Sequence, residues 1–155
     1  MLMKALPLYI LLLVASIGLS CKKNCCTNID ANITISLVSK SSENLLAPPN
    51  GLTLADINVY YMKDGVKMLY FERHLNASKG VLIHKHSDGQ EKLTLFPTLN
   101  KDKFTETLVE FGDLGTDTIR CEYHKTNNQD LVKKVWLNGK LVWDNNGIRA
   151  ITIVK

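Results

Sequence analysis

The segment Asp117-Thr-Ile-Arg-Cys-Glu-Tyr-His124 decides the fold class of this chain, because apolar and polar side chains alternate along it with a period of two. The apolar members share one face of the predicted strand, and they are Ile119, Cys121 and Tyr123. The polar members, which are Arg120, Glu122 and His124, share the opposite face. This alternation is typical of a strand with one face in a core and the other toward solvent.

The same alternation recurs through most of the chain after residue 30, and no long helical period accompanies it. Further strands are predicted over residues 31–38, 106–111 and 149–154. Three hairpins are predicted around turn dipeptides, which are Asp64-Gly65, Asp88-Gly89 and Asn138-Gly139. About ten short strands separated by turn signals favour an all-β fold, an immunoglobulin-like or related antiparallel β-sandwich over residues 31–155. Alternation alone does not separate a sandwich from a small barrel.

A two-residue type I′ loop fixes which residues face each other across a hairpin. Lys63 is therefore expected opposite Val66 in the first hairpin, and Leu137 opposite Lys140 in the third. Several aromatic residues fall on both faces of these hairpins: Tyr60, Tyr61, Tyr70, Phe71, Trp136 and Trp143, with Trp136 and Trp143 expected on the same face. Since one face of a sandwich sheet is core, some of these rings are expected to be less buried.

The N-terminal segment has the three parts of a signal peptide, namely a basic start, an apolar middle and small residues before the cut. Lys4 supplies the charge, and Ala5 to Leu19 supply the apolar run. This run is short for a permanent membrane span, which needs about 20 apolar residues. We therefore predict a signal peptide over residues 1–20 and a tether over residues 21–30.

The end of that segment, Ile17-Gly-Leu-Ser-Cys21, resembles the bacterial lipobox, although Gly18 stands where many lipoboxes have Leu. The resemblance implies that cleavage leaves Cys21 as the first mature residue and that its thiol carries palmitate-type acyl chains. Two or more such chains attach a protein stably to a bacterial membrane. The alternative is ordinary secretion with a cysteine near the cut.

The residues that follow, Lys22 and Lys23, are basic. Surface-exported lipoproteins of the Bacteroidetes type are typically acidic at this point. By that resemblance we expect a cell-envelope protein anchored in the outer membrane and facing the periplasm. Lys22 and Lys23 either contact anionic head groups or remain solvated.

The charge and the cysteine content limit which partners and which disulfides can be expected. Loss of residues 1–20 removes one lysine, so the formal charge falls from +4 to +3, and no basic run is interleaved with aromatics. Nucleic acid is therefore not an expected partner. With Cys21 assigned to lipid, one disulfide between Cys25 or Cys26 and Cys121 is one interpretation. The other is that Cys121 is a small buried thiol.

The best candidate for chemistry is a set of three potential metal ligands, His84, His86 and Glu91. A two-residue loop at Asp88-Gly89 would place His86 opposite Glu91, so that all three lie on one face. Two histidines and a carboxylate can chelate a metal ion. The simpler interpretation is a sheet face that is buried in the core away from the turn and exposed to solvent at the tip of the hairpin, with no metal.

Other chemical signals are weaker. Asp117-Thr118-Ile119 resembles the Bacteroidetes O-glycosylation motif, which makes Thr118 a candidate modification site. The sequence contains no Gly-x-Ser-x-Gly elbow and no Gly-x-Gly-x-x-Gly or phosphate-loop pattern. We therefore expect neither an enzyme nor a cofactor.

Four segments resemble small uncharacterised cell-envelope lipoproteins of gut Bacteroidetes. They are Asn44-Leu-Leu-Ala-Pro48, Phe111-Gly-Asp113 with Asp117-Thr-Ile119, Lys134-Val-Trp-Leu-Asn-Gly139 and Thr152-Ile-Val-Lys155. The resemblance spans most of the mature chain. It implies an envelope lipoprotein with an all-β domain, and it implies no activity.

The leading hypothesis is a lipid-anchored, non-catalytic module that binds an envelope protein, a glycan or a cell-wall component. One alternative is a metal-binding envelope protein that uses His84, His86 and Glu91. Another is a structural subunit of a surface assembly, in which an edge strand at 31–38 or 149–154 pairs with a neighbour.

Radiolabelled palmitate should be incorporated into the wild-type protein and into Cys25→Ser and Cys26→Ser variants, but not into Cys21→Ser. The wild-type protein should then fractionate with membranes, since multiple acyl chains make attachment stable. A wild-type protein that takes up no label and is recovered in the aqueous fraction would contradict the predicted anchor.

Overall fold

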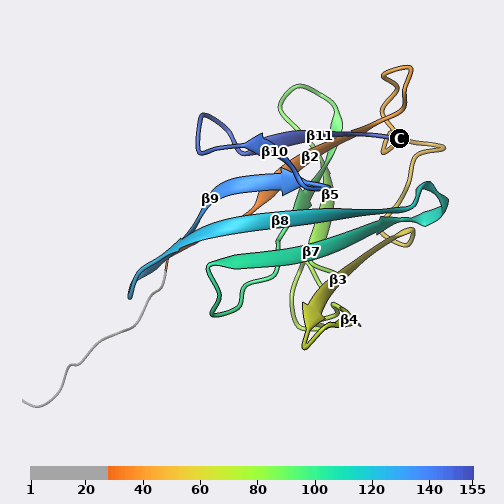
Figure 1. Ribbon diagram of the computed structural model, residues 1–155. Helices are drawn as coiled ribbons and strands as arrows, with labels where there is room; N and C mark the ends of the chain where they lie inside the picture. Colours follow the sequence, from red (N-terminus) through yellow and green to blue (C-terminus); the bar gives the residue numbers. More distant parts are fainter. Residues whose placement is uncertain (1–27) are drawn as a thin grey trace, which may run out of the picture.

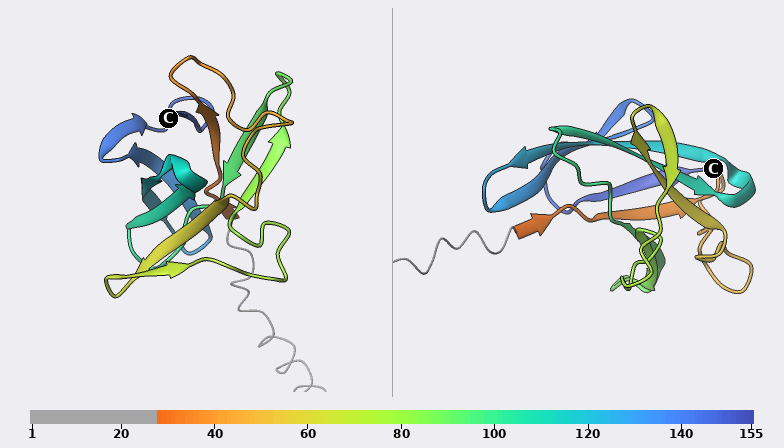
Figure 2. Two further views of the ribbon diagram at one scale, coloured as in Figure 1. Left: turned by 90° about the vertical axis from the view of Figure 1, so that its right-hand side faces the viewer. Right: turned by 90° about the horizontal axis from the view of Figure 1, so that it is seen from below.

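The computed structural model describes residues 28–155, which form two β-sheets packed face to face (Figures 1 and 2). The described chain contains these strands: β1 (Asn28–Asp30), β2 (Ile33–Val38), β3 (Ile57–Lys63), β4 (Val66–Leu69), β5 (Val81–Lys85), β6 (Glu91–Leu95), β7 (Phe104–Phe111), β8 (Thr116–Lys125), β9 (Gln129–Leu137), β10 (Lys140–Trp143) and β11 (Ala150–Val154). A single 3₁₀ turn, η1 (Gly112–Leu114), joins β7 to β8. The predicted all-β sandwich is confirmed.

The larger sheet has the order β1-β9-β8-β7-β3-β4, with β10 also paired to β9. The smaller sheet has the order β11-β2-β6-β5. Most pairs are antiparallel, whereas β1 runs parallel to β9 and β11 runs parallel to β2. β2 lies between two partners, so the expectation that residues 31–38 form an edge strand is wrong. β11, by contrast, is at an edge of its sheet.

The core fills the space between the two sheets, and alternation within each strand decides which side chains enter it. The predicted inner face of β8 is confirmed, since Ile119, Cys121 and Tyr123 are all buried. β2 contributes Ile33, Ile35 and Leu37, none of which has exposed surface. Each fully buried side chain of this size contributes roughly 1.5–3 kcal/mol relative to an exposed one.

Two of the three predicted hairpin registers are confirmed. Lys63 pairs with Val66 and Leu137 pairs with Lys140. In the first turn both central residues have positive φ, 51° at Asp64 and 79° at Gly65, as a type I′ turn requires.

The third hairpin departs from prediction after its first two pairs. Leu141 faces Trp136, but a β-bulge then brings Trp143 opposite Val135 instead of leaving it on the face of Trp136. Trp143 is consequently buried in the core, while Trp136 stays on the outer face of the sheet. Simple alternation does not reveal a bulge, because one extra residue reverses the faces beyond it.

Arg149 joins the beginning of the described chain to the sandwich. The tether expected over residues 21–30 is wrong for its last three residues, because Asn28–Asp30 form β1 beside β9. Arg149 Nη1 donates to Asp30 Oδ1 and to the Asn32 carbonyl, both at 3.0 Å. The guanidinium also lies 4.8 Å from the centre of the Trp143 ring. The hydrogen bond from Arg149 lowers the pKa of Asp30.

A second ion pair joins the two sheets at the opposite end. Lys155 Nζ lies 2.7 Å from Asp117 Oδ2, and the two side chains are only 12% and 8% exposed. Asn138 Nδ2 donates to the other oxygen of Asp117 at 2.8 Å. The Lys155 amide donates to the Val38 carbonyl at 2.9 Å. Lys155, which follows β11, therefore connects β2 of the smaller sheet to β8 of the larger one.

Lys155→Ala should reduce the free energy of unfolding by about 3 kcal/mol, because Asp117 would be left buried without its cation. Lys140→Ala is the matched control, since Lys140 is exposed and should change stability by less than about 0.5 kcal/mol. Urea unfolding of both variants measures this difference. Equal stabilities would show that the ion pair contributes nothing.

Candidate binding cleft

The β5–β6 hairpin does not have the predicted register. His84 pairs with Lys92, and Lys85 pairs with Glu91. The His86 amide donates to the Gln90 carbonyl at 2.8 Å, which leaves residues 87–89 as a three-residue loop. Gly89 adopts a φ of 80°, the left-handed conformation that ends such a loop. The predicted pairing of His86 with Glu91 is therefore wrong.

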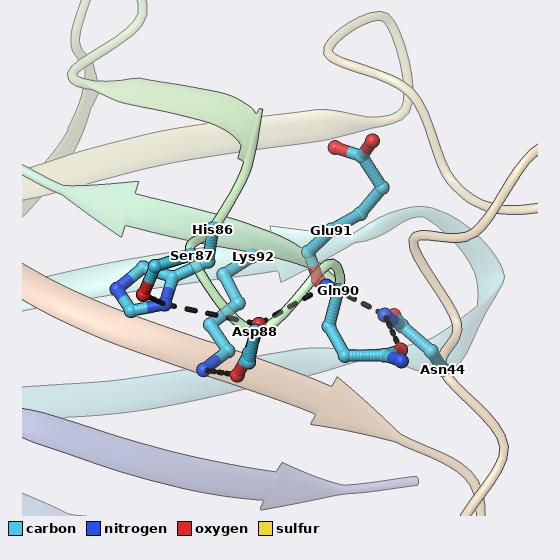
Figure 3. A network of polar contacts seen from close by, with 7 residues as sticks. All are labelled: Asn44, His86, Ser87, Asp88, Gln90, Glu91 and Lys92. Carbon is cyan, nitrogen blue, oxygen red and sulfur yellow. Dashed lines mark hydrogen bonds and ion pairs between the residues drawn. The ribbon is translucent and has the colours of Figure 1, made fainter.

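This shift of one residue separates the three expected metal ligands. Side chains of a strand alternate between faces, so Glu91 lies on the opposite face from His84 and His86. Figure 3 shows the Glu91 carboxylate pointing away from the His86 ring. The two histidine rings are 6.4 Å apart, but no group of three potential metal ligands occurs among residues 28–155.

The polar groups at this tip instead stabilise the loop itself (Figure 3). The Gln90 amide donates to Asp88 Oδ1 at 3.0 Å, and Lys92 Nζ donates to Asp88 Oδ2. The hydrogen bond from Lys92 is the main cause of a lowered pKa at Asp88. Asn44 Nδ2 reaches the Glu91 carbonyl at 3.0 Å and joins the loop to the segment after β2.

Cys121 is a free thiol on the inner face of β8, and it has no exposed surface. Desolvation raises its pKa to about 12. The proposed disulfide partners Cys25 and Cys26 lie outside the described residues, as do Cys21 and the predicted signal peptide.

Thr118, the candidate glycosylation site, is half-buried near the start of β8. Its amide and carbonyl both bond to Asn138, at 2.9 Å in each case. Glycosylation of Thr118 stays a prediction.

An open cleft of about 620 Å³ lies between the β3–β4 hairpin and residues 96–102. Four aromatic side chains line it, and they are Tyr61, Tyr70, Phe71 and Phe96. Three of these, Tyr61, Tyr70 and Phe71, are among the six aromatic residues that the hairpin pattern distributes over both sheet faces. Phe71 and Phe96 are the most open, with 55% and 43% of their surface exposed.

Polar groups surround these rings. Carboxylates are supplied by Asp64, Glu72 and Asp102, and an amide by Asn100. Asn100 Nδ2 donates to Asp102 Oδ2 at 2.9 Å, which fixes both side chains on one wall. Desolvation raises the pKa of Tyr70. Its phenol hydroxyl can both donate and accept a hydrogen bond at neutral pH, as tyrosine hydroxyls ordinarily do.

A second depression of about 380 Å³ adjoins the cleft and shares four lining residues with it, which are Met62, Thr98, Asn100 and Asp102. Here the Arg120 guanidinium lies 4.5 Å from the centre of the Phe104 ring and 5.8 Å from that of Trp136. The remaining predicted aromatic, Tyr60, donates to Glu110 Oε2 at 2.9 Å on the outer face of the sheet.

Sequence reasoning missed the wall formed by residues 96–102. This segment lacks the alternation that marked the strands, so nothing assigned its side chains to a face. The available signal was its composition, because Phe96 and Leu99 are apolar residues in a stretch that also contains Pro97 and Asn100. Apolar residues in a predicted loop indicate either a buried loop or an exposed binding surface.

No family model matches the chain, and comparisons with curated proteins and with solved structures find no match either.

Cys121 should react with a thiol reagent at pH 8 only when the protein unfolds, because almost none of a thiol with a pKa of about 12 is ionised there. Burial of the neutral thiol also stabilises the fold below pH 9, and this contribution should be lost as pH rises from 9 toward 12. Cys121→Ala should lack that component of the decline. Thiol reactivity is measured by timed labelling of a Cys21→Ser/Cys25→Ser/Cys26→Ser variant, in which Cys121 is the remaining cysteine. Rapid stoichiometric labelling of this folded variant would contradict burial of Cys121.

Proposed function

We propose that this chain is a lipid-anchored protein of the bacterial cell envelope whose β-sandwich is a non-catalytic glycan-binding module. The anchor is Cys21, and the binding site is the aromatic cleft between the β3–β4 hairpin and residues 96–102. The single observation that carries the proposal is this cleft, in which exposed aromatic rings stand beside carboxylate and amide groups.

The chemistry of the cleft suits a sugar. Small-molecule sites combine an apolar lining with a few polar groups that fix orientation. The C–H faces of a pyranose ring can pack on Phe71 and Phe96, while its hydroxyls donate to the carboxylates of Asp64 and Asp102 and exchange hydrogen bonds with Asn100. The open shape admits one or more residues of a longer chain without a closing lid.

The chemistry of Cys121 argues against a role for this residue as a nucleophile. Cys121 is the only cysteine among residues 28–155, and its buried thiol remains protonated at neutral pH. A nucleophilic cysteine needs the opposite, a lowered pKa and access to solvent.

A second candidate is a structural subunit that pairs with a neighbour through β4. All four residues of β4, Val66–Leu69, are exposed, and within the described chain this strand pairs only with β3. Such an edge can accept another strand. Sedimentation across a range of concentrations separates the two roles, because subunit pairing requires concentration-dependent growth in size and glycan binding does not.

Phe71→Ala and Phe96→Ala should each weaken glycan binding about tenfold, a loss of about 1.4 kcal/mol, without lowering stability appreciably. Ile148→Ala is the matched control, because Ile148 is also apolar and is 81% exposed but lies away from the cleft. A glycan array on the purified protein identifies the ligand, and titration calorimetry measures each variant. An empty array, or equal weakening by the Ile148 control, would contradict the proposal.

A further inference from the structure

The described chain begins at the end of the sandwich where β8 turns into β9 (Figure 1). Asn28 pairs with Gln129, and its amide donates to the Asn128 carbonyl at 2.7 Å. Cys21 precedes Asn28 by seven residues, which can span at most about 25 Å when fully extended. If Cys21 is acylated, this end of the sandwich lies within that distance of the membrane.

The same end carries a shallow groove of about 330 Å³ whose lining is basic. Its lining residues are Lys101, Lys103, Tyr123, His124 and Lys125, and no carboxylate is among them. Lys101 and Lys103 come from the segment after β6, whereas His124 and Lys125 come from the end of β8. Two separate parts of the chain therefore bring their ammonium groups to one surface.

Neighbouring groups position these lysines. Lys103 Nζ lies 2.8 Å from Glu122 Oε1, yet its side chain stays 65% exposed. Lys125 Nζ donates to the Asn100 carbonyl and lies 3.9 Å from Asp130 Oδ1. Lys101 is exposed and has no ion pair within residues 28–155. Glu122 and Asp130 hold Lys103 and Lys125 in place, although the Lys125 side chain is only 23% exposed. Lys101 is available to an anion.

Apolar side chains are also exposed at this end of the domain. Ile29, Leu99 and Phe104 are 55%, 40% and 38% exposed. Exposed apolar residues among lysines are typical of a surface that rests in the headgroup region of a bilayer. Lys22 and Lys23 are among the six residues between Cys21 and Asn28, and they add positive charge to the sequence that precedes this end.

We propose that the groove formed by Lys101, Lys103 and Lys125 docks on the phosphate groups of the anionic phospholipid surface to which Cys21 is attached. The inference rests on the proposed lipid anchor and adds a second contact, made by the folded domain itself. The short connection keeps the groove close to the phosphates, and each lysine near an anionic surface is attracted to it. The protein is then held in one orientation instead of swinging on its anchor.

This orientation also fixes the position of the aromatic cleft relative to the membrane. The segment 97–103 separates the two sites, with Asn100 and Asp102 lining the cleft and Lys101 and Lys103 lining the groove. Docking of the groove would therefore hold the aromatic cleft beside the lipid headgroups and immobilise one of its walls.

Hydrogen exchange of the acylated full-length protein tests this proposal. Amides of residues 98–103 and 125–129 are compared in phosphatidylethanolamine/phosphatidylglycerol vesicles, in phosphatidylcholine vesicles and in detergent. We expect exchange in the phosphatidylglycerol vesicles to be at least tenfold slower than in the other two. Equal rates in all three, with acylation of Cys21 verified by intact mass, would overturn the docking and leave the anchor standing.

Two matched triple variants identify the groups responsible. Lys101→Gln/Lys103→Gln/Lys125→Gln should remove the slowing. Lys40→Gln/Lys85→Gln/Lys140→Gln should retain it, because these lysines are exposed at the other end of the domain, where Lys40 follows β2, Lys85 ends β5 and Lys140 begins β10. Equal behaviour of the two variants would overturn the assignment to the groove.

Two controls complete the test. The first distinguishes phospholipid phosphate from free phosphate, and the second distinguishes failure of docking from failure of the anchor. Inorganic phosphate added in detergent should leave the exchange unchanged, and slowing as large as in vesicles would show a free-anion site instead of a membrane contact. An intact mass without acyl chains on Cys21 would overturn the proposed anchor, and with it the premise of docking.

Discussion

The structure depends on one constraint, the pairing register that decides which face of each strand enters the core. Side chains alternate between faces, so a shift of one residue would exchange the core set of a strand for its surface set. In β2 and β8 the register places Ile33, Ile35, Ile119 and Cys121 between the sheets, where they have no exposed surface. The two ion pairs that join the sheets, at Arg149 and Lys155, then form at fixed positions.

Where the local pattern and the loop geometry agree, the sequence was sufficient to predict the structure. The inner face of β8 and the register of the first hairpin follow from alternation and from a two-residue turn. Asp88-Gly89 is ambiguous, because the same dipeptide can also end a three-residue loop with Gly89 in the left-handed conformation. That one additional loop residue removed the predicted metal-ligand set, and the bulge before Trp143 moved this ring off the predicted face of Trp136 and into the core.

The candidate site was only half predictable for a related reason. Tyr61, Tyr70 and Phe71 belong to a set of aromatic residues on both faces of the hairpins. Only one face of a sandwich sheet enters the core, so the core cannot bury all of these rings. Their partners across the cleft, Phe96 and Asn100, belong to a segment with no period, so only the tertiary structure brings them together. The same segment supplies lysines to the neighbouring basic groove. One irregular connection thus forms parts of both surfaces at the end where the described chain begins.

Cross-strand nuclear Overhauser effects in the β5–β6 hairpin measure the register most directly. Hα–Hα contacts are closest between residues that face each other in non-hydrogen-bonded pairs of antiparallel strands. The structure predicts strong contacts between Ile83 and Leu93 and between Lys85 and Glu91. Strong contacts between His84 and Leu93 and between His86 and Glu91 would contradict it, and they would return the two histidines and Glu91 to one face.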